Sequence, residues 1–458
     1  MSPKRPINAD VPAPENGKEK PTPSEQETQQ LPEVKAEASK EPKPGPKVKA
    51  GKKPKSPAPK FLLGLVVLAL AFIVAAIVGG SGGGEESATA PAPAPAPAPA
   101  RDTEEAPAAE TSEALGYPSF ATNNTVRIGG ADPASNAAAV SLAVFPSTTP
   151  EQRPTAVTLV SEEDWAGAVA GSVLMAPPIR APLLFSAADE LPEPTEEALS
   201  ALAPQGGKAT QGASLFAIGA VALPDAGMVA RVDSGDPART AAQIATLRDR
   251  LFGEPPAHIV IASGAQPEFA VPAAAWAARS GDPVLFSEAE KLPPPTAAVL
   301  EKHPKVPVYV LGPPAAISKE VLREIGKISK RVDRVAGKDA VGTALALARY
   351  RDGDFGWNVN DPGHGFVLVR SDSPADAAAA APLSASGTWG PLLLTDSADT
   401  LPADVRSYLL DVKPGYTTDP TRAFYNHVWV VGDQEAIGVT QQAEVNELAE
   451  LAKIGGGE

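Results

Sequence analysis

A six-residue pattern occurs three times in this chain at nearly equal spacing, and it constrains the fold more than any other feature. An arginine is followed five positions later by an aspartate in RIGGAD from Arg127, in RVDSGD from Arg231 and in RVAGKD from Arg334. The first residues of the three copies are 104 and 103 positions apart. A pattern that returns at a fixed period predicts tandem copies of one structural unit.

Three short apolar segments follow each copy in the same order. The first ends in serine, the second follows a proline and the third ends in glycine: AVTLVS, HIVIAS and GFVLVRS; PLLF, PVLF and PLLL; LFAIG, VYVLG and VWVVG. Alanine-rich stretches lie between them, and Asp132 and Asp236, each followed by proline, are typical helix N-caps. Short apolar strands alternating with helices predict parallel sheets covered on both faces, and so three doubly wound α/β units. We place them at residues 125–230, 231–333 and 334–454.

The chain before the repeats has a different composition. Residues 1–60 are rich in Pro, Lys, Glu and Gln, which predicts a disordered basic tail. The uncharged segment FLLGLVVLALAFIVAAIV within residues 61–79 is long enough to predict one transmembrane helix. Residues 80–120 contain SGGGEE and APAPAPAPAPA, which predict a Gly/Pro/Ala-rich stalk.

Charge differs on the two sides of that apolar segment. Residues 1–60 hold 13 Lys and Arg against 8 Asp and Glu, a net charge of +5. Because the whole chain has a net charge of −15, the remaining residues carry −20. The positive-inside rule predicts a single-pass cell-membrane protein with a cytoplasmic N-terminus and its repeats outside the cell. So acidic an external part argues against nucleic-acid binding.

The ordered set of motifs resembles the cell wall-binding repeat 2 family. The third repeat shows it best, in RVAGKD, SDSPADAAAAAPLSA, PLLLTDSADTLP and VWVVGDQEAI, and the second adds VYVLGPPAAISKEV. The resemblance covers about residues 126–454. It implies three Rossmann-like repeats around a pseudo-threefold axis that hold the protein non-covalently to a wall glycopolymer.

The resemblance also implies candidate ligand-binding positions. They are the leading arginines and the apolar residues after proline: Arg127, Arg231, Arg334, Leu183, Leu184, Val284, Leu285, Leu392 and Leu393. Two other roles stay open, because a short apolar strand is usually core and an arginine can bind the next unit as well as a phosphate or carboxylate. The acidic charge means that an anionic polymer would need local arginines, bridging divalent ions or neutral sugar contacts.

Neither a cofactor, a metal nor an enzymatic activity is predicted. The four histidines are scattered, cysteine is absent, and no nucleophile or phosphate-binding motif occurs. DGDFGWNVNDPGHG from Asp352 is expected to be a polar surface loop inserted in the third repeat.

The predicted function is a membrane-anchored envelope protein whose repeats bind cell-wall glycopolymer and link membrane to wall. The first and second repeats replace the family's central Asp-Ala pair, with WAGAVAGS from Trp165 and FAVPAAAW from Phe269. The alternative is therefore an extracellular protein-binding scaffold that has lost polymer affinity.

Overall fold

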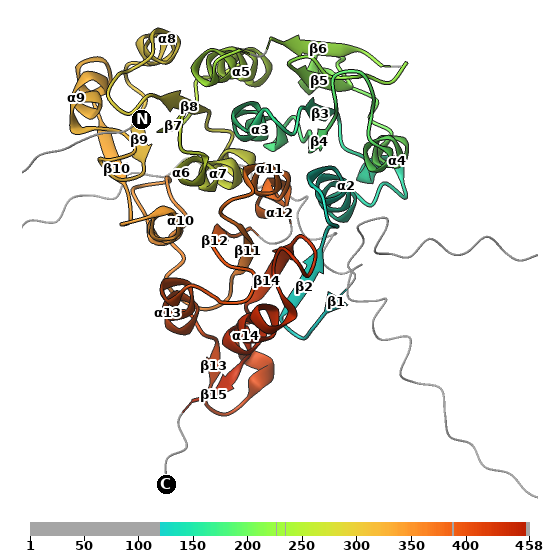
Figure 1. Ribbon diagram of the computed structural model, residues 1–458, viewed down its shortest axis with the longest axis vertical. Coiled ribbons are helices and arrows are strands. Elements are labelled where there is room, and N and C mark those ends of the chain that lie inside the picture. The colour runs from blue at the N-terminus through green and yellow to red at the C-terminus, as the bar shows by residue number, and fades with distance from the viewer. Residues whose placement is uncertain (1–119, 226, 234, 387–388, 455–458) are drawn as a thin grey trace, which may run out of the picture. The chain divides into compact units, whose positions relative to one another are not determined.

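The computed structural model describes residues 120–225, 227–233, 235–386 and 389–454. They form three α/β units, each built on one main sheet, together with one two-stranded ribbon (Figure 1). The sequence explains the parallel sheets, because the central strands are short, mostly apolar and largely buried.

The first unit has the sheet order β4-β3-β5-β6, and all its strands are parallel. Its strands are β3 (Val157–Val160), β4 (Leu183–Phe185), β5 (Leu215–Ile218) and β6 (Val229–Val232). Its helices are α2 (Pro133–Val144), α3 (Trp165–Gly171) and α4 (Glu193–Leu202), with short 3-10 turns η1 (Pro150–Gln152), η2 (Ser172–Met175) and η3 (Lys208–Thr210).

The second unit has the parallel order β8-β7-β9-β10. Its strands are β7 (Ile259–Ser263), β8 (Val284–Ser287), β9 (Val308–Leu311) and β10 (Val332–Val335). Its helices are α5 (Pro237–Phe252), α6 (Pro267–Ala270), α7 (Pro272–Ser280), α8 (Pro294–Lys302) and α9 (Lys319–Ile328).

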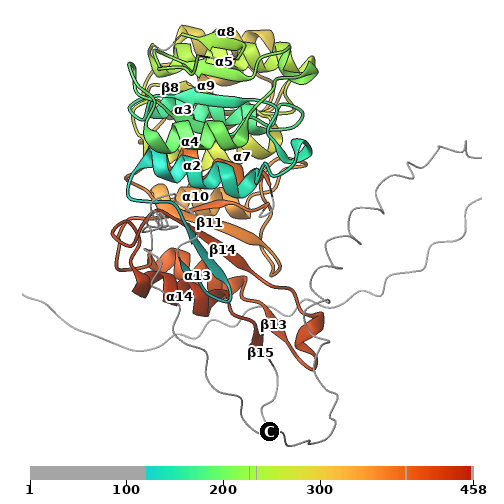
Figure 2. The ribbon, with the colours of Figure 1, turned by 90° about the vertical axis from the view of Figure 1, so that its right-hand side faces the viewer.

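The third unit has the order β12-β11-β14-β2-β1, in which only β1 runs antiparallel. Its strands are β11 (Gly365–Arg370), β12 (Leu392–Thr395) and β14 (His427–Val431), with β2 (Thr125–Ile128) and β1 (Phe120–Ala121) from the start of the repeats. Its helices are α10 (Ala340–Arg349), α11 (Pro374–Ala379), α12 (Ala381–Ala385), α13 (Ala403–Asp411) and α14 (Val439–Ala449), with the turn η4 (Pro420–Arg422). The ribbon of β13 (Gly415–Tyr416) and β15 (Ala452–Lys453) projects from this unit (Figure 2).

The repeated six-residue pattern forms the junction between units. Its strands β6 and β10 are the edges of the first and second sheets, whereas the following helices α5 and α10 pack on β8 and β12 of the next sheet. The first copy closes the set, because β2 pairs with β14 near the other end of the chain. We call β2, β6 and β10 the linking strands.

The aspartate that ends each pattern is an N-cap, as predicted for the first two. Asp132 accepts a hydrogen bond from the backbone N–H of Ser135, Asp236 from that of Arg239, and Asp339 from that of Gly342, at 2.7–3.0 Å. Each cap satisfies a donor of the first helical turn. The pattern therefore specifies a strand, a turn and a helix start.

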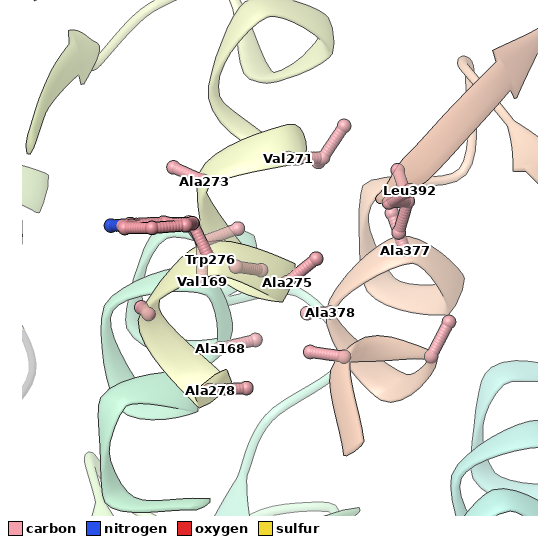
Figure 3. Close-up of a cluster of buried hydrophobic side chains, with 14 of the residues drawn as sticks. Ala168, Val169, Val271, Ala273, Ala275, Trp276, Ala278, Ala377, Ala378 and Leu392 are labelled. Carbon is pink, nitrogen blue, oxygen red and sulfur yellow. The ribbon is translucent and has the colours of Figure 1, made fainter. Parts of the chain in front are cut away.

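One helical segment from each unit meets the others in a buried cluster. Figure 3 shows α3, α7 and α11 in contact through Ala168, Ala275, Ala278, Ala377 and Ala378. All five alanines are fully buried. Small side chains let these helices approach closely, which explains why the helical stretches before the second apolar strand are rich in alanine.

The predicted fold class needs one correction. Within the described ranges, no helix is both long enough and apolar enough to span a lipid bilayer. The described residues have an α/β fold with parallel sheets, and none of their helices is the transmembrane helix that the sequence suggested. The segment assigned to that helix, residues 61–79, lies outside the described residues, as do the predicted tail and all but the last residue of the stalk.

The insertion after α10 also differs from expectation, because its aromatic residues are buried. Phe355 is fully buried and stacks on Tyr309 of β9, with ring centroids 3.6 Å apart. Trp357 is 6% exposed and meets Trp276 of α7 edge to face. The sequence shows these aromatic residues among polar ones, but not their aromatic partners, Tyr309 and Trp276, which come from the second unit. The loop therefore fastens the third unit to the second.

Candidate functional site

The predicted apolar positions all lie in sheet interiors. Leu183 and Leu184 are in β4, Val284 and Leu285 in β8, and Leu392 and Leu393 in β12. None is more than 2% exposed. These six residues are therefore part of the core, which was the alternative role for them. Their contact with a polymer stays a prediction.

Arg127 is buried at the junction of the third unit. Its guanidinium donates hydrogen bonds to the carbonyl of Gly432 at 2.8 Å and to Oε1 of Gln442 at 3.0 Å. It also donates to the carbonyls of Asp433 and Ile437, which lie in the turn that leads into α14. Burial lowers the pKa of Arg127, partly offset by the charge of Asp433. Arg127 thus joins the first linking strand to a loop more than 300 positions away.

Arg334 makes the corresponding contacts in the second unit. It donates to the carbonyls of Gly312 and Ile317 at 2.7 Å each and to that of Ser318 at 3.2 Å. Gly312 directly follows β9, and Ser318 is the N-cap of α9. Gly312 has a φ of +98°, which glycine adopts without the strain of other residues. In both units, the arginine stabilises the turn between the third strand and a helix.

Arg231 is different, because it is exposed and forms no hydrogen bond or ion pair with the described residues. It has the same register as the others, since it lies opposite Ala217 as Arg334 lies opposite Val310. In the first unit, however, β5 is followed by β6 without an intervening helix. The carbonyls that a helix start would present are missing, so the guanidinium of Arg231 is free for a ligand.

Two further arginines line the same cleft as Arg231. The cleft has a volume of about 330 Å³ and runs along α5. Arg239 and Arg250 lie 11 residues apart on this helix, which is about 16 Å along the axis. Gln243 and Thr246 lie between them on the same face. We call this the arginine cleft; it is elongated, basic and located on an otherwise acidic protein.

Acidic groups border the arginine cleft at two places. Nε of Arg239 lies 3.7 Å from Oδ2 of Asp236. Both side chains are more than half exposed, so this ion pair is weak. Arg231 also lines a second cleft of about 710 Å³ at the carboxyl ends of β3, β5 and β6, with Glu163, Asp164 and Asp233. This edge of a parallel sheet is where ligands usually bind in α/β proteins. Its carboxylates can accept hydrogen bonds from hydroxyl groups.

The third unit has an aromatic cleft of about 600 Å³ at the opposite ends of its strands. Trp389 and Tyr425 are 53% and 55% exposed, and His427 and Trp429 lie beside them. Burial lowers the pKa of His427, which favours the neutral ring at pH 7. The negative face of an aromatic ring attracts the polarised C–H groups of a sugar ring, so this cleft suits a neutral sugar contact.

Only part of the arginine cleft was predictable. Arg231 was a candidate in the sequence, but Arg239 and Arg250 were missed. Their spacing of three helical turns after an N-cap was a visible signal. What the spacing did not reveal is that β6 runs beside this face of α5, because that depends on the pairing of β6 with β5.

Comparisons with known proteins agree with the geometry. The sequence model of Cell wall binding domain 2 (CWB2) matches residues 231–322 and 334–441, which lie in the second and third repeats. Cwp6 from Clostridium difficile has a similar structure, with a TM-score of 0.57 at 20% identity over 71% of this chain and 48% of that chain. Cwp8 from the same organism gives 0.55 at 19% identity over 72% and 52%.

Identities this low concern the fold alone, and the chain spans about half the length of these two proteins. No curated protein matches the chain. The family match supports binding to the cell wall. The second and third repeats of the chain thus match the Cell wall binding domain 2 family.

Proposed function

We propose that the repeats bind an anionic cell-wall glycopolymer non-covalently at the cell surface, and that the arginine cleft supplies its charged contacts. The observation that carries this is the unengaged guanidinium of Arg231, whose counterparts Arg127 and Arg334 are bonded to backbone carbonyls. Arginine binds phosphate or carboxylate through paired N–H donors. The elongated cleft suits an extended polymer better than a compact ligand.

Two further features fit a glycan as the ligand. The carboxylates next to Arg231 can accept hydrogen bonds from sugar hydroxyls. The aromatic cleft of the third unit offers a stacking surface. A polymer that alternates charged groups with neutral sugars has chemistry for both kinds of surface. The acidity of the chain repels such a polymer elsewhere, which confines binding to these places.

The test is sedimentation of the full chain with purified wall. The variant carries Arg231→Ala, Arg239→Ala and Arg250→Ala, and the control carries Lys305→Ala, Arg323→Ala and Lys330→Ala, which remove the same charge from exposed positions of the second unit. We expect the first variant to lose most sedimentation and the control to behave like the unaltered chain. Higher salt should weaken binding, because the contacts are exposed.

The result also separates polymer from protein as the partner. Removing anionic polymer from the wall should abolish sedimentation of the unaltered chain. A chelator arm reveals whether divalent ions bridge the polymer to the acidic surface. Equal sedimentation of the cleft variant and the control would contradict the proposal. Retention on wall stripped of polymer would favour the protein-binding scaffold instead.

A further inference from the structure

In each unit a helix follows the edge strand β4, β8 or β12: α4 in the first unit, α8 in the second and α13 in the third. The units differ in the helices that pack against it. In the second unit α8 packs between α5 and α9, and in the third unit α13 packs between α10 and α14. In the first unit α4 packs on α2, but no helix connects β5 to β6 to cover the other side of α4 (Figures 1 and 2). The first unit therefore lacks one helix that both other units have.

The missing helix has a defined chemistry in the sister units. In α9 the side chains of Val321 and Ile325 are fully buried, while the charged residues face solvent. In α14, Val445 and Leu448 are buried. α9 is amphipathic and buries its apolar side against its unit, whereas α14 buries Gln441 and Gln442 as well. A helix with the same pattern fits the corresponding place in the first unit.

The place is open in the first unit as a groove of about 1290 Å³. Leu199 of α4, Leu215 of β5 and Leu223 of the following loop give it an apolar floor. A ten-residue helix is about 15 Å long and about 10 Å wide with side chains, or roughly 1,200 Å³. The groove therefore has room for a helix of the length of α9.

The rim of the groove is acidic. Asp189, Glu190, Glu196 and Glu197 are exposed along it. No lysine or arginine is among the described residues that line it. An apolar floor with one sign of charge around it selects an apolar stripe flanked by the opposite charge. We propose that this groove binds a basic amphipathic helix of a partner protein, in the place that α9 and α14 fill in the other units.

The chain supplies its own probe for this proposal. A labelled peptide of residues 318–329, the α9 segment, carries three basic and two acidic side chains off its apolar stripe. Glu320→Lys with Glu324→Lys makes the peptide fully basic, and Lys319→Glu, Arg323→Glu and Lys327→Glu make it fully acidic. All versions share one apolar stripe and pay a similar cost of helix formation, so their comparison isolates charge.

Binding to the full chain is measured by fluorescence anisotropy. We expect the basic peptide to bind at least about tenfold more tightly than the acidic one, which is about 1.4 kcal/mol. The chain variant Glu196→Lys with Glu197→Lys should abolish or reverse this preference. The matched control, Glu301→Lys with Glu324→Lys on α8 and α9, should leave it unchanged, because that pair of helices already covers its sheet.

Two results would overturn the proposal. One is equal affinity of the basic and acidic peptides, or a preference that Glu196→Lys with Glu197→Lys does not change. The other is self-association of the unaltered chain that the same double variant abolishes, because the occupant would then be a second copy. Circular dichroism of the variants shows whether they are folded, and a folded variant that binds neither peptide differently from the unaltered chain also counts against the groove.

Discussion

The three equivalent arginines should differ sharply in what they contribute to stability. Replacing each with methionine keeps most of the side-chain volume and removes every donor. Arg127→Met leaves the carbonyls of Gly432, Asp433 and Ile437 without their buried partner. An unsatisfied buried acceptor costs about 1–3 kcal/mol, and partial hydration lowers the sum. We expect Arg127→Met to lower the free energy of unfolding by about 3–5 kcal/mol.

The other two positions form the internal comparison. Arg334 is only partly buried, so Arg334→Met should lower the free energy of unfolding by about 1–3 kcal/mol. Arg231 contacts no acceptor among the described residues, so Arg231→Met should stay within about 0.5 kcal/mol of the unaltered chain. In wall sedimentation we expect the opposite order. Arg231→Met should reduce sedimentation more than Arg334→Met, because Arg231 is the arginine proposed to contact polymer.

Urea unfolding of the full chain, followed by circular dichroism, measures the three values. The midpoint is the safer quantity here, because a chain of three units can unfold in more than one step. If all the described residues unfold together, a loss of about 3 kcal/mol corresponds to a shift in Tm of roughly 4 °C. If the three variants fall within about 0.5 kcal/mol of one another, or if Arg231→Met is the most damaging, the assigned roles are wrong.

Three other predictions concern a carboxyl group, a ring and a cap. Burial raises the pKa of Asp376, so the folded chain binds the carboxyl proton more tightly than the unfolded chain does. The free energy of unfolding should therefore fall as pH rises from about 4 through that raised pKa. Asp376→Asn should remove this fall in urea titrations at several pH values, and an unchanged dependence on pH would contradict the reasoning. Phe355→Ala should cost about 3–5 kcal/mol in the same assay, because it empties a fully buried ring site, and a loss below about 1 kcal/mol would show that the loop does not fasten the units. Asp236→Ala should cost about 1 kcal/mol as the loss of an N-cap, whereas Asp236→Asn should restore most of it.

The repeat and its local structure were predictable from sequence, because they depend on near neighbours. Alternating apolar strands and alanine-rich helices predicted three parallel α/β units. The aspartate before Pro133 or Pro237 predicted a helix start, and the structure confirms both caps. These signals work because capping, chain reversal and burial of a short strand are settled within a few residues.

Contacts between distant segments were not predictable in the same way. The aromatic residues of the insertion look solvent-exposed in sequence, yet Phe355 stacks on a tyrosine of the second unit. The apolar segment of residues 61–79 suggested a membrane helix; it lies outside the described residues, and none of the described helices could span a bilayer. Hydropathy reports what a segment could do, and neighbours in space decide what an apolar side chain contacts.

The six-residue pattern shows where the division lies. Sequence alone determined that a strand with an arginine leads through a turn to a capped helix, three times. Only the tertiary structure decided that β6 and β10 join the preceding sheets, that β2 joins the last sheet beside β14, and that Arg127 and Arg334 are bonded while Arg231 is free. The physical reason is that an arginine's role depends on the acceptors within its reach, and one missing helix between β5 and β6 removes them.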